Sequence, residues 1–161
     1  MQPSITVRPL QYDDITAVTR WMMAIPLWQR YDLTAEKIQD ELKQALEADD
    51  ILLTADSGDD CRACCLAWAM PRAVFGRSAY LKRFAVAESS AGRGVGSALL
   101  TATEQRVAQS HNDMMLLVSD FNHGAQRFYR RHGYVQIGAL PGYAIPDITE
   151  LIFWKRLKTT L

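Results

Sequence analysis

The feature that most constrains the fold is a run of alternating glycines, Gly92, Gly94 and Gly96, where a strand pattern gives way to a helix pattern. Residues 79–87 form a short run with the pattern of a strand, and residues 95–110 have the pattern of a helix with Val95, Leu99 and Ala102 on one face. Glycines let several backbone N–H groups converge on one point, and a helix N-terminus directs about half a positive charge there. The turn therefore predicts an anion site, with phosphate as the best-fitting anion.

Arg93 lies in the same turn and would add a charged hydrogen bond to a bound phosphate. Two other phosphate motifs fit less well. A dinucleotide fold requires G-x-G-x-x-G/A after the first strand. Here Ser97 stands at the last Gly/Ala position of that motif, and the run lies in the middle of the chain. A Walker loop requires a lysine after the glycines, and none follows here. The remaining alternative is a tight strand-to-helix turn that binds no ligand.

Hydrophobic periodicity over the rest of the chain indicates one mixed α/β domain spanning residues 1–161. Strand patterns cover residues 4–10, 51–55, 62–70, 79–87, 114–118, 134–139 and 148–154. Helix patterns cover residues 15–25, 35–48, 95–110 and 122–132. The predicted order is β-αα-βββ-α-β-α-ββ, with about seven strands flanked by about four helices. One crossover helix makes two neighbouring strands parallel in a central sheet that is otherwise mostly antiparallel.

Polar residues mark the starts of the first two helices. Asp13 and Asp14 offer side-chain oxygens that could cap the first helix, and Thr34 offers one for the second. Pro26 should end the first helix, because proline disfavours a helical conformation in the residue before it. Residues 26–31 are therefore predicted to form an aromatic connector between the two helices.

The charge and hydropathy of the chain exclude several classes of protein. The 161 residues carry 18 Lys and Arg against 18 Asp and Glu, so the formal net charge is zero. This balance argues against broad, phosphate-driven binding of nucleic acid, which needs a basic face. No window reaches the roughly 18 apolar residues of a membrane helix, and the N-terminal segment lacks the order of a signal peptide. We therefore expect a cytoplasmic protein with no nucleic-acid or membrane partner.

The three cysteines, Cys61, Cys64 and Cys65, are bunched in one segment. An odd, clustered set cannot form a closed disulfide framework and fits a reducing compartment. Cys61 and Cys64 have the spacing of half a zinc site, but no second Cys or His pair follows at ligand spacing. We expect no metal, and we expect the thiols to be buried or idle on a strand.

Two motifs together resemble those of the GNAT superfamily of acetyl-CoA-dependent N-acetyltransferases. The first is a hydrophobic strand ending in Val, followed by Q/R-x-x-G-x-G/A at a helix start, which Val86 and residues 91–96 match. The second is an Asn after the next strand, then Ala, Phe-Tyr and Gly-Phe/Tyr. Its counterparts here are Asn122, Ala125, Phe128, Tyr129, Gly133 and Tyr134. The order of elements agrees as well, so the resemblance covers essentially the whole chain.

The sequence departs from the family pattern at two positions. Ala91 stands where the family usually has Gln or Arg, and Glu88 stands where Pro is common. The first departure removes one possible contact to a pyrophosphate. The motif binds mainly through backbone N–H groups, and Arg93 lies nearby, so we expect binding to persist.

The resemblance implies an acetyltransferase that takes acetyl-CoA as acyl donor and a primary amine as acceptor, by direct transfer in a ternary complex. The pantetheine arm would pair with the backbone of a splayed strand, and the pyrophosphate would lie on the glycine turn. The implied cofactor-binding residues are Phe84, Ala85, Val86, Gly92, Arg93, Gly94, Val95, Gly96, Ser97, Asn122, Ala125 and Phe128. Asn122 could also be a helix N-cap, and both roles can hold at once because its side chain and backbone offer separate groups. Ala125 with Phe128 could equally be core packing.

The same resemblance suggests catalytic roles. The backbone N–H of Val86 would stabilise the oxyanion, and the phenol of Tyr129 would protonate the sulfur of coenzyme A. The structural alternative for Tyr129 is a buried core tyrosine. The acidic residue that many members carry on the strand before the glycine turn is missing from residues 80–86. Asp120 is the candidate base, with Glu150 or a chain of water molecules as alternatives.

In this family the acceptor pocket comes from the first two helices with their connector and from the loop between the last two strands. Here those segments supply Trp28, Tyr31 and Tyr143, whose aromatic walls suit a cationic or apolar-flanked amine, either a small molecule or a peptide. Two other functions stay open: a non-catalytic acyl-CoA sensor or interaction module of the same fold, and a regulatory domain that binds another nucleotide. The sequence also leaves a homodimer open.

Overall fold

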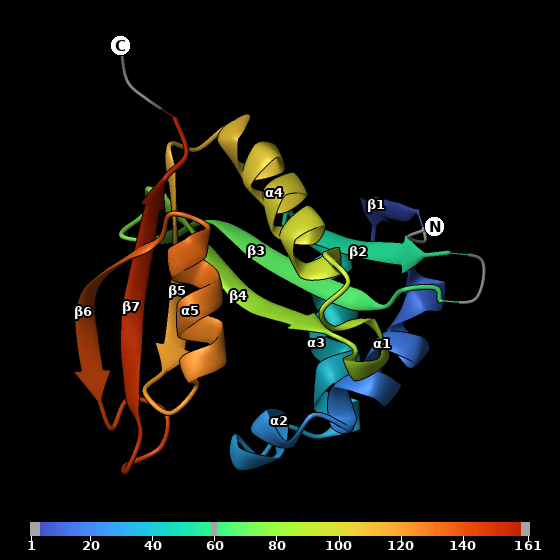
Figure 1. Cartoon of the computed structure of the whole chain (residues 1–161), viewed down its shortest axis with the longest axis horizontal. Coiled ribbons are helices and arrows are strands. Elements are labelled where there is room, and N and C mark those ends of the chain that lie inside the picture. Colours follow the sequence, from blue (N-terminus) through green and yellow to red (C-terminus); the bar gives the residue numbers. More distant parts are fainter. Residues whose placement is uncertain (1–3, 59–60, 159–161) are drawn as a thin grey trace. The chain divides into compact units, whose positions relative to one another are not determined.

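The computed structural model describes residues 4–58 and 61–158. Two compact units are described in turn, the first made of Met1–Ala69 with Arg83–Thr103 and the second of Met70–Lys82 with Glu104–Leu161. Two strands and one helix, β3 (Cys65–Val74), β4 (Ser78–Val86) and α4 (Val95–Ala108), run from one unit into the other. Figure 1 follows all the elements along the chain.

The first unit contains the N-terminal strands and helices. Besides its parts of β3, β4 and α4, it holds β1 (Ile5–Pro9), β2 (Ile51–Ser57), α1 (Ile15–Met23), α2 (Pro26–Arg30) and α3 (Ala35–Glu47). β1 and β2 pair antiparallel with Ile5 opposite Ser57, and β2 and β3 pair antiparallel with Leu52 opposite Trp68. These pairings agree with the predicted, mostly antiparallel sheet.

The helices of the first unit follow from local sequence signals. The side chain of Thr34 accepts the N–H of Lys37 at 3.2 Å, which confirms the predicted cap of α3. Val18 and Met22 of α1 and Ile38 and Leu42 of α3 are fully buried at helical spacing, and these two helices pack on each other. Apolar residues four positions apart share one helix face, and burial of that face stabilises both helices.

The predicted connector over residues 26–31 is partly wrong, because it contains the short helix α2. Pro26 occupies the first helical position, where its fixed φ suits a helix and its missing N–H needs no partner. The sequence motif that ends α1 thus also starts α2. The described residues contain five α-helices and two short 3₁₀ helices, η1 (Tyr12–Asp14) and η2 (Glu88–Ser90), against about four helices predicted.

The second unit contains the C-terminal half of the sheet. It adds β5 (Asp113–Ser119), α5 (His123–Arg131), β6 (Val135–Pro141) and β7 (Thr149–Arg156), coloured from amber to red in Figure 1. β5 pairs parallel with the start of β4, from Ala79 opposite Met114 to Leu81 opposite Leu116. β7 pairs antiparallel with both β5 and β6. Met114, Tyr134 and Phe153 form a buried core here.

The seven strands are hydrogen-bonded in the order β1-β2-β3-β4-β5-β7-β6. Both the predicted mixed α/β class and the predicted parallel pair across the crossover helix are confirmed. Most predicted elements differ from the observed ones by a few residues at their ends. The start of β3 matters most, because the strand begins at Cys65, so Cys61 and Cys64 lie in the loop before it rather than on a strand. Within the part of the chain that the structure describes, no helix has the length and apolar character needed to cross a membrane.

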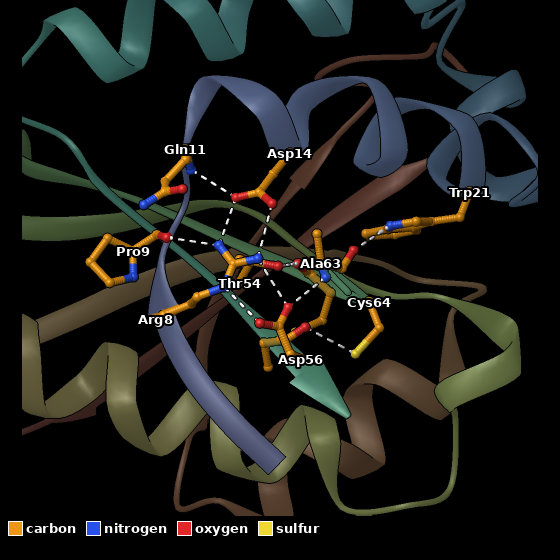
Figure 2. Close-up of polar contacts among 11 residues, drawn as sticks. Arg8, Pro9, Gln11, Asp14, Trp21, Thr54, Asp56, Ala63 and Cys64 are labelled. Atoms are coloured by element: carbon orange, nitrogen blue, oxygen red, sulfur yellow. Dashed lines mark hydrogen bonds and ion pairs between the residues drawn. The ribbon is translucent and has the colours of Figure 1, made fainter. Parts of the chain in front are cut away.

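An arginine on β1 binds two carboxylates at once (Figure 2). Arg8 Nη1 lies 2.7 Å from Asp14 Oδ2, and Arg8 Nε lies 2.8 Å from Asp56 Oδ2. A second bond to each carboxylate, at 2.9 and 3.0 Å, makes both contacts bidentate. Asp14 also accepts the N–H of Gln11, and Asp56 accepts the N–H of Ala63, both at 2.9 Å. This network, here called the Arg8 cluster, joins β1, β2, the start of α1 and the loop before β3.

The Arg8 cluster should make stability depend on pH in acid. Hydrogen bonds from Arg8 lower the pKa of Asp14 and of Asp56 below the usual value near 3.9. The unfolded chain therefore binds more protons, so this stabilisation is complete above about pH 4 and is lost as the pH falls through the lowered pKa values. We expect the free energy of unfolding in urea to fall below pH 4, and to fall less in Asp56→Asn. An equal acid slope in the two proteins would contradict this account.

Candidate functional site

The glycine turn lies in the first unit, between η2 and the start of α4. Gly92 has φ +72° and Gly94 has φ +81°, a left-handed conformation that favours glycine. A Cβ atom at Gly92 would meet no atom within 4 Å, and one at Gly94 would meet only Ile5 Cδ1, at 4.0 Å. Residues 91–94 are all exposed. Backbone conformation rather than crowding thus requires these glycines, and the space above them is open to a ligand.

The start of α4 presents backbone donors to this space. The first helical hydrogen bond joins the N–H of Ala98 to the carbonyl of Gly94, at 3.0 Å. The N–H groups of Val95 and Gly96 therefore have no carbonyl within the helix to which they could donate. Their partial positive charge, the helix dipole and the exposed guanidinium of Arg93 all favour an anion.

The end of β4 leads into this turn. Ala85 is buried, whereas Phe84 and Val86 on either side of it are half-buried, as expected of alternating strand positions. The N–H of Ala87 donates to the carbonyl of Cys64 at 2.8 Å, which fixes the chain just past Val86. The predicted residues 84–86 and 92–97 therefore lie in the same unit, on either side of η2.

The second unit holds the other motif, at the junction of β5 and α5. The side chain of Asn122 accepts the N–H of Ala125 at 3.1 Å, so the predicted N-cap is confirmed. Phe128 and Tyr129 are in edge-on contact, with ring centroids 5.3 Å apart. Tyr129 also packs edge-on against Tyr134, at 5.6 Å.

Tyr129 is buried, with 7% of its surface exposed. Burial raises the pKa of its phenol, because a phenolate would lose its hydration. The side chain therefore keeps its proton at neutral pH. A protonated phenol is what a general acid must be before it acts.

The two candidate bases have different surroundings in the second unit. Asp120 is exposed, and its carboxylate accepts the N–H of Thr149 at 3.3 Å. Glu150 is buried on β7, with the hydroxyl of Ser119 at 3.5 Å. Solvent therefore reaches the carboxylate of Asp120 but hardly that of Glu150.

Sequence reasoning missed Gln126 at this junction. Its side-chain amide donates to the carbonyl of Ser119 at 3.2 Å and to that of Asp120 at 2.9 Å. These bonds tie the end of β5 to α5 and so fix the backbone that carries Asp120. The only sequence signal is the helical spacing of Gln126 from Asn122.

The predicted acceptor residues fall in different units. Trp28 in α2 and Tyr31 directly after it belong to the first unit. Tyr143, 66% exposed, lies between β6 and β7 in the second unit.

Trp28 belongs to a group that sequence reasoning did not find. The guanidinium of Arg83 lies 5.9 Å from the ring centroids of both Trp28 and Trp68 and forms an ion pair with Glu41 of α3. Residues 80–86 contain no carboxylate, but Glu41 brings one to β4 from a helix. The sequence signal for this group was Arg83, a charged residue next to Phe84 near the end of a mainly apolar strand pattern.

Within 4–58 and 61–158, no group of three or more His, Cys, Asp or Glu side chains is arranged to hold an ion. The half zinc site suggested by Cys61 and Cys64 therefore gains no further ligand from these residues.

Several solved structures share this fold. A protein assigned to the GNAT acetyltransferases of Desulfovibrio desulfuricans aligns with TM-score 0.81 at 19% identity, over 96% of this chain and 100% of that one. An aminoglycoside 6′-N-acetyltransferase complexed with coenzyme A aligns with TM-score 0.78 at 16% identity, over 97% and 99%. The yncA protein of Salmonella typhimurium, with its cofactor acetyl-CoA, aligns with TM-score 0.80 at 13% identity, over 98% and 96%. At these identities the likeness establishes the fold.

Sequence comparison gives the family. No curated protein matches the chain. The family model of the acetyltransferase (GNAT) family matches residues 15–134, which include the glycine turn, the junction of β5 and α5, and most of the helices and strands. This chain therefore belongs to the acetyltransferase (GNAT) family.

Proposed function

We propose that this protein transfers the acetyl group of acetyl-CoA to a primary amine, directly, within a ternary complex. The observation that carries the proposal is the open glycine turn at the start of α4, in a chain of the GNAT family. Two structures of the same fold contain coenzyme A or acetyl-CoA, which supports this choice of donor.

The residues present fit the donor. The pyrophosphate would accept the N–H groups of Arg93, Gly94, Val95, Gly96 and Ser97, with the Arg93 side chain adding a charged hydrogen bond. The pantetheine arm would pair with the backbone of residues 84–86. Asn122 caps α5 through its side-chain oxygen, and we assign its amide nitrogen to pantetheine, with Ala125 and Phe128 as the adjoining wall.

The reaction needs a neutral amine, a polarised carbonyl and a protonated leaving group. An alkyl ammonium with a pKa near 10.4 is neutral in only about one molecule in two thousand at pH 7, so a base must take its proton. We assign that role to Asp120. The amine nitrogen bonds to the thioester carbon, the backbone N–H of Val86 stabilises the oxyanion, and the carbon–sulfur bond then breaks. Tyr129 gives its proton to the departing sulfur, and the extra proton on the nitrogen of the new amide then returns to the Tyr129 phenolate.

For the acceptor we propose a primary amine that lies against aromatic side chains. We assign Trp28, Tyr31 and Tyr143 to the binding of this amine. The contact of Trp28 with the Arg83 guanidinium supports a wall with a charged as well as an aromatic part. A small molecule and a peptide N-terminus both satisfy this description.

A second candidate is a non-catalytic module that binds acyl-CoA. The observation that favours it is the absence of a carboxylate from residues 80–86, the strand segment where many family members carry one. This candidate shares the donor site and differs only in turnover. Binding experiments therefore test the donor site, and product formation separates the two functions.

A matched pair of glycine substitutions tests the donor site. Gly92 and Gly76 have nearly the same conformation, φ +72° and +67°, and a Cβ at either would meet no atom within 4 Å. Alanine should therefore cost the same strain at both positions, about 1–2 kcal/mol. Only Gly92→Ala should also disturb the N–H groups that hold the pyrophosphate. We expect it to raise the dissociation constant for acetyl-CoA at least tenfold, and Gly76→Ala to leave it unchanged.

Thermal denaturation with added ligand makes the measurement. Acetyl-CoA at a hundredfold excess over its Kd should stabilise the wild type by about 2.7 kcal/mol, or roughly 5–10 °C in Tm. ATP should give no comparable shift. Equal acetyl-CoA shifts in Gly92→Ala and Gly76→Ala would remove the turn from the donor site, and a shift with ATP alone would favour a nucleotide-binding domain instead.

A further inference from the structure

The thiols that the proposed reaction does not use lie beside the glycine turn, in the first unit. Cys61 Sγ is 3.4 Å from the hydroxyl oxygen of Ser90, which precedes the turn. Cys64 Sγ donates to the carbonyl of Ala55 at 3.2 Å (Figure 2). Cys64 lies three residues after Cys61 in the same loop and directly before Cys65, the first residue of β3. The three thiols are thus gathered at the loop before β3, with Cys61 beside Ser90.

The thiols differ in exposure and in acidity. Cys61 is partly exposed, whereas Cys64 and Cys65 are 1% and 0% exposed. A solute can therefore reach Cys61 before the others. Hydrogen bonding from Cys65, and then from Ser90 and Cys61, lowers the pKa of the Cys64 thiol, and the same pairing raises the pKa of Cys65. Cys64 is thus the better nucleophile of the two buried thiols.

The loop that carries Cys61 and Cys64 is held on several sides. Trp21 Nε1 of α1 donates to the carbonyl of Ala63 at 2.8 Å, and the N–H of Ala63 donates to Asp56 of the Arg8 cluster (Figure 2). Ala63 itself has φ +48°, a strained value for a residue with a Cβ atom. The carbonyl of Cys64 accepts the N–H of Ala87, and Cys61 Sγ lies beside the hydroxyl of Ser90. The loop therefore contacts both ends of residues 87–90.

We propose that Cys61 and Cys64 form a redox site, which a hydroperoxide converts to a disulfide, and that this disulfide weakens binding of coenzyme A at the glycine turn. The Cys61 thiolate attacks the peroxide, its sulfur gains one oxygen, and an alcohol or water leaves. The Cys64 thiolate then attacks the Cys61 sulfenic acid, the sulfur–sulfur bond forms, and hydroxide leaves and takes a proton. Two thiols and one hydroperoxide become one disulfide, one alcohol or water, and one further water.

The expected link to the turn is geometric. A disulfide requires a sulfur–sulfur distance of about 2.05 Å and a fixed dihedral angle, and its formation removes the thiol proton that Cys64 donates to the Ala55 carbonyl. We expect Cys61 Sγ to move away from Ser90 as well. The loop then shifts, and its contacts with Ala87 and Ser90 pass the shift to the residues just before Gly92. This second half of the proposal rests on the proposed donor site.

Alkylation of the denatured protein, read by intact mass, tests the redox site. Reduced wild type should carry three iodoacetamide labels, one on each cysteine, and protein treated with one equivalent of hydrogen peroxide should carry one label, on Cys65. Cys65→Ala should still form the disulfide, whereas Cys61→Ser should form none. Three labels after peroxide, a sulfinic acid in place of the disulfide, or a Cys64–Cys65 disulfide in the wild type would each overturn the proposal.

Thermal denaturation of the same two samples tests the coupling. We expect acetyl-CoA to raise the Tm of the reduced protein and to need at least a threefold higher concentration for the same rise in the oxidised protein. The difference should vanish in Cys61→Ser. Equal shifts in reduced and oxidised wild type would overturn the coupling. No shift in either form would instead overturn the proposed donor site, while the alkylation result would still decide the redox site.

Discussion

Replacing Tyr129 by phenylalanine should lower kcat for acetyl transfer by at least about 100-fold, the lower end of what general acid catalysis contributes. The substitution removes only the hydroxyl, and the ring that packs against Phe128 and Tyr134 stays. The Tm and the affinity for acetyl-CoA should therefore change little. Steady-state release of coenzyme A, measured with a responsive amine, gives kcat and KM separately.

Tyr134→Phe is the matched control. Tyr134 is 2% exposed, belongs to the same aromatic cluster and has no role in the proposed chemistry. Its loss of a buried hydroxyl should alter Tm without a comparable change in kcat. If Tyr129→Phe keeps the wild-type kcat, Tyr129 is a core tyrosine and another group protonates the sulfur.

Arg8→Met should lower the free energy of unfolding by about 3 kcal/mol, the value typical when one partner of a buried ion pair is removed. The side chains of Arg8, Asp14 and Asp56 are 19%, 7% and 24% exposed, so solvent screens their charges only in part. Methionine fills similar space but leaves two carboxylates without their shared cation. Urea denaturation at pH 7 measures the change.

Two further variants separate the contribution of charge from that of hydrogen-bond geometry in the Arg8 cluster. Arg8→Lys keeps the charge but cannot bind both carboxylates bidentately, so it should fall between wild type and Arg8→Met. Adding Asp56→Asn to Arg8→Met should cost less than it costs alone, because the charge it removes is already uncompensated. A loss below about 1 kcal/mol in Arg8→Met would mean that the cluster contributes no more than a surface ion pair.

The parts of the fold that the sequence predicted are those set by local pattern. Thr34 caps α3 because its oxygen meets an N–H three residues ahead, and Ile38 with Leu42 repeats at helical spacing. The parallel pairing of β4 and β5 follows from a single crossover helix between them. The cap and the helical spacing lie within a few residues of one another, and the parallel pairing needs only the order of the elements, so a single sequence contains these signals.

The parts that the sequence did not predict depend on residues distant in the chain. Asp14 was expected to cap α1, but its carboxylate binds Arg8 and the N–H of Gln11 instead. The contact of Arg8 with Asp56 spans 48 positions, and that of Arg83 with Glu41 spans 42. No periodicity reports these pairings, which only the folded strands and helices bring about.

The candidate site divides in the same way. Gly92 and Gly94 were predicted from composition at a strand-to-helix boundary, and their positive φ values confirm the tight turn. The cap at Asn122 was predicted in the same manner and is confirmed. The roles of Val86, Asp120 and Tyr129 stay predictions, since they depend on where acetyl-CoA and the acceptor lie.

The most direct test of the central claim is release of coenzyme A from acetyl-CoA by the purified protein across a panel of primary amines, with products identified by mass. The panel should include small cationic amines, amino acids and peptides with free N-termini. The account predicts that at least one amine accelerates release and gains one acetyl group in equal amount, and that Tyr129→Phe suppresses both. Tight binding of acetyl-CoA with no acetylated amine anywhere in the panel would contradict it and identify a non-catalytic acyl-CoA-binding module.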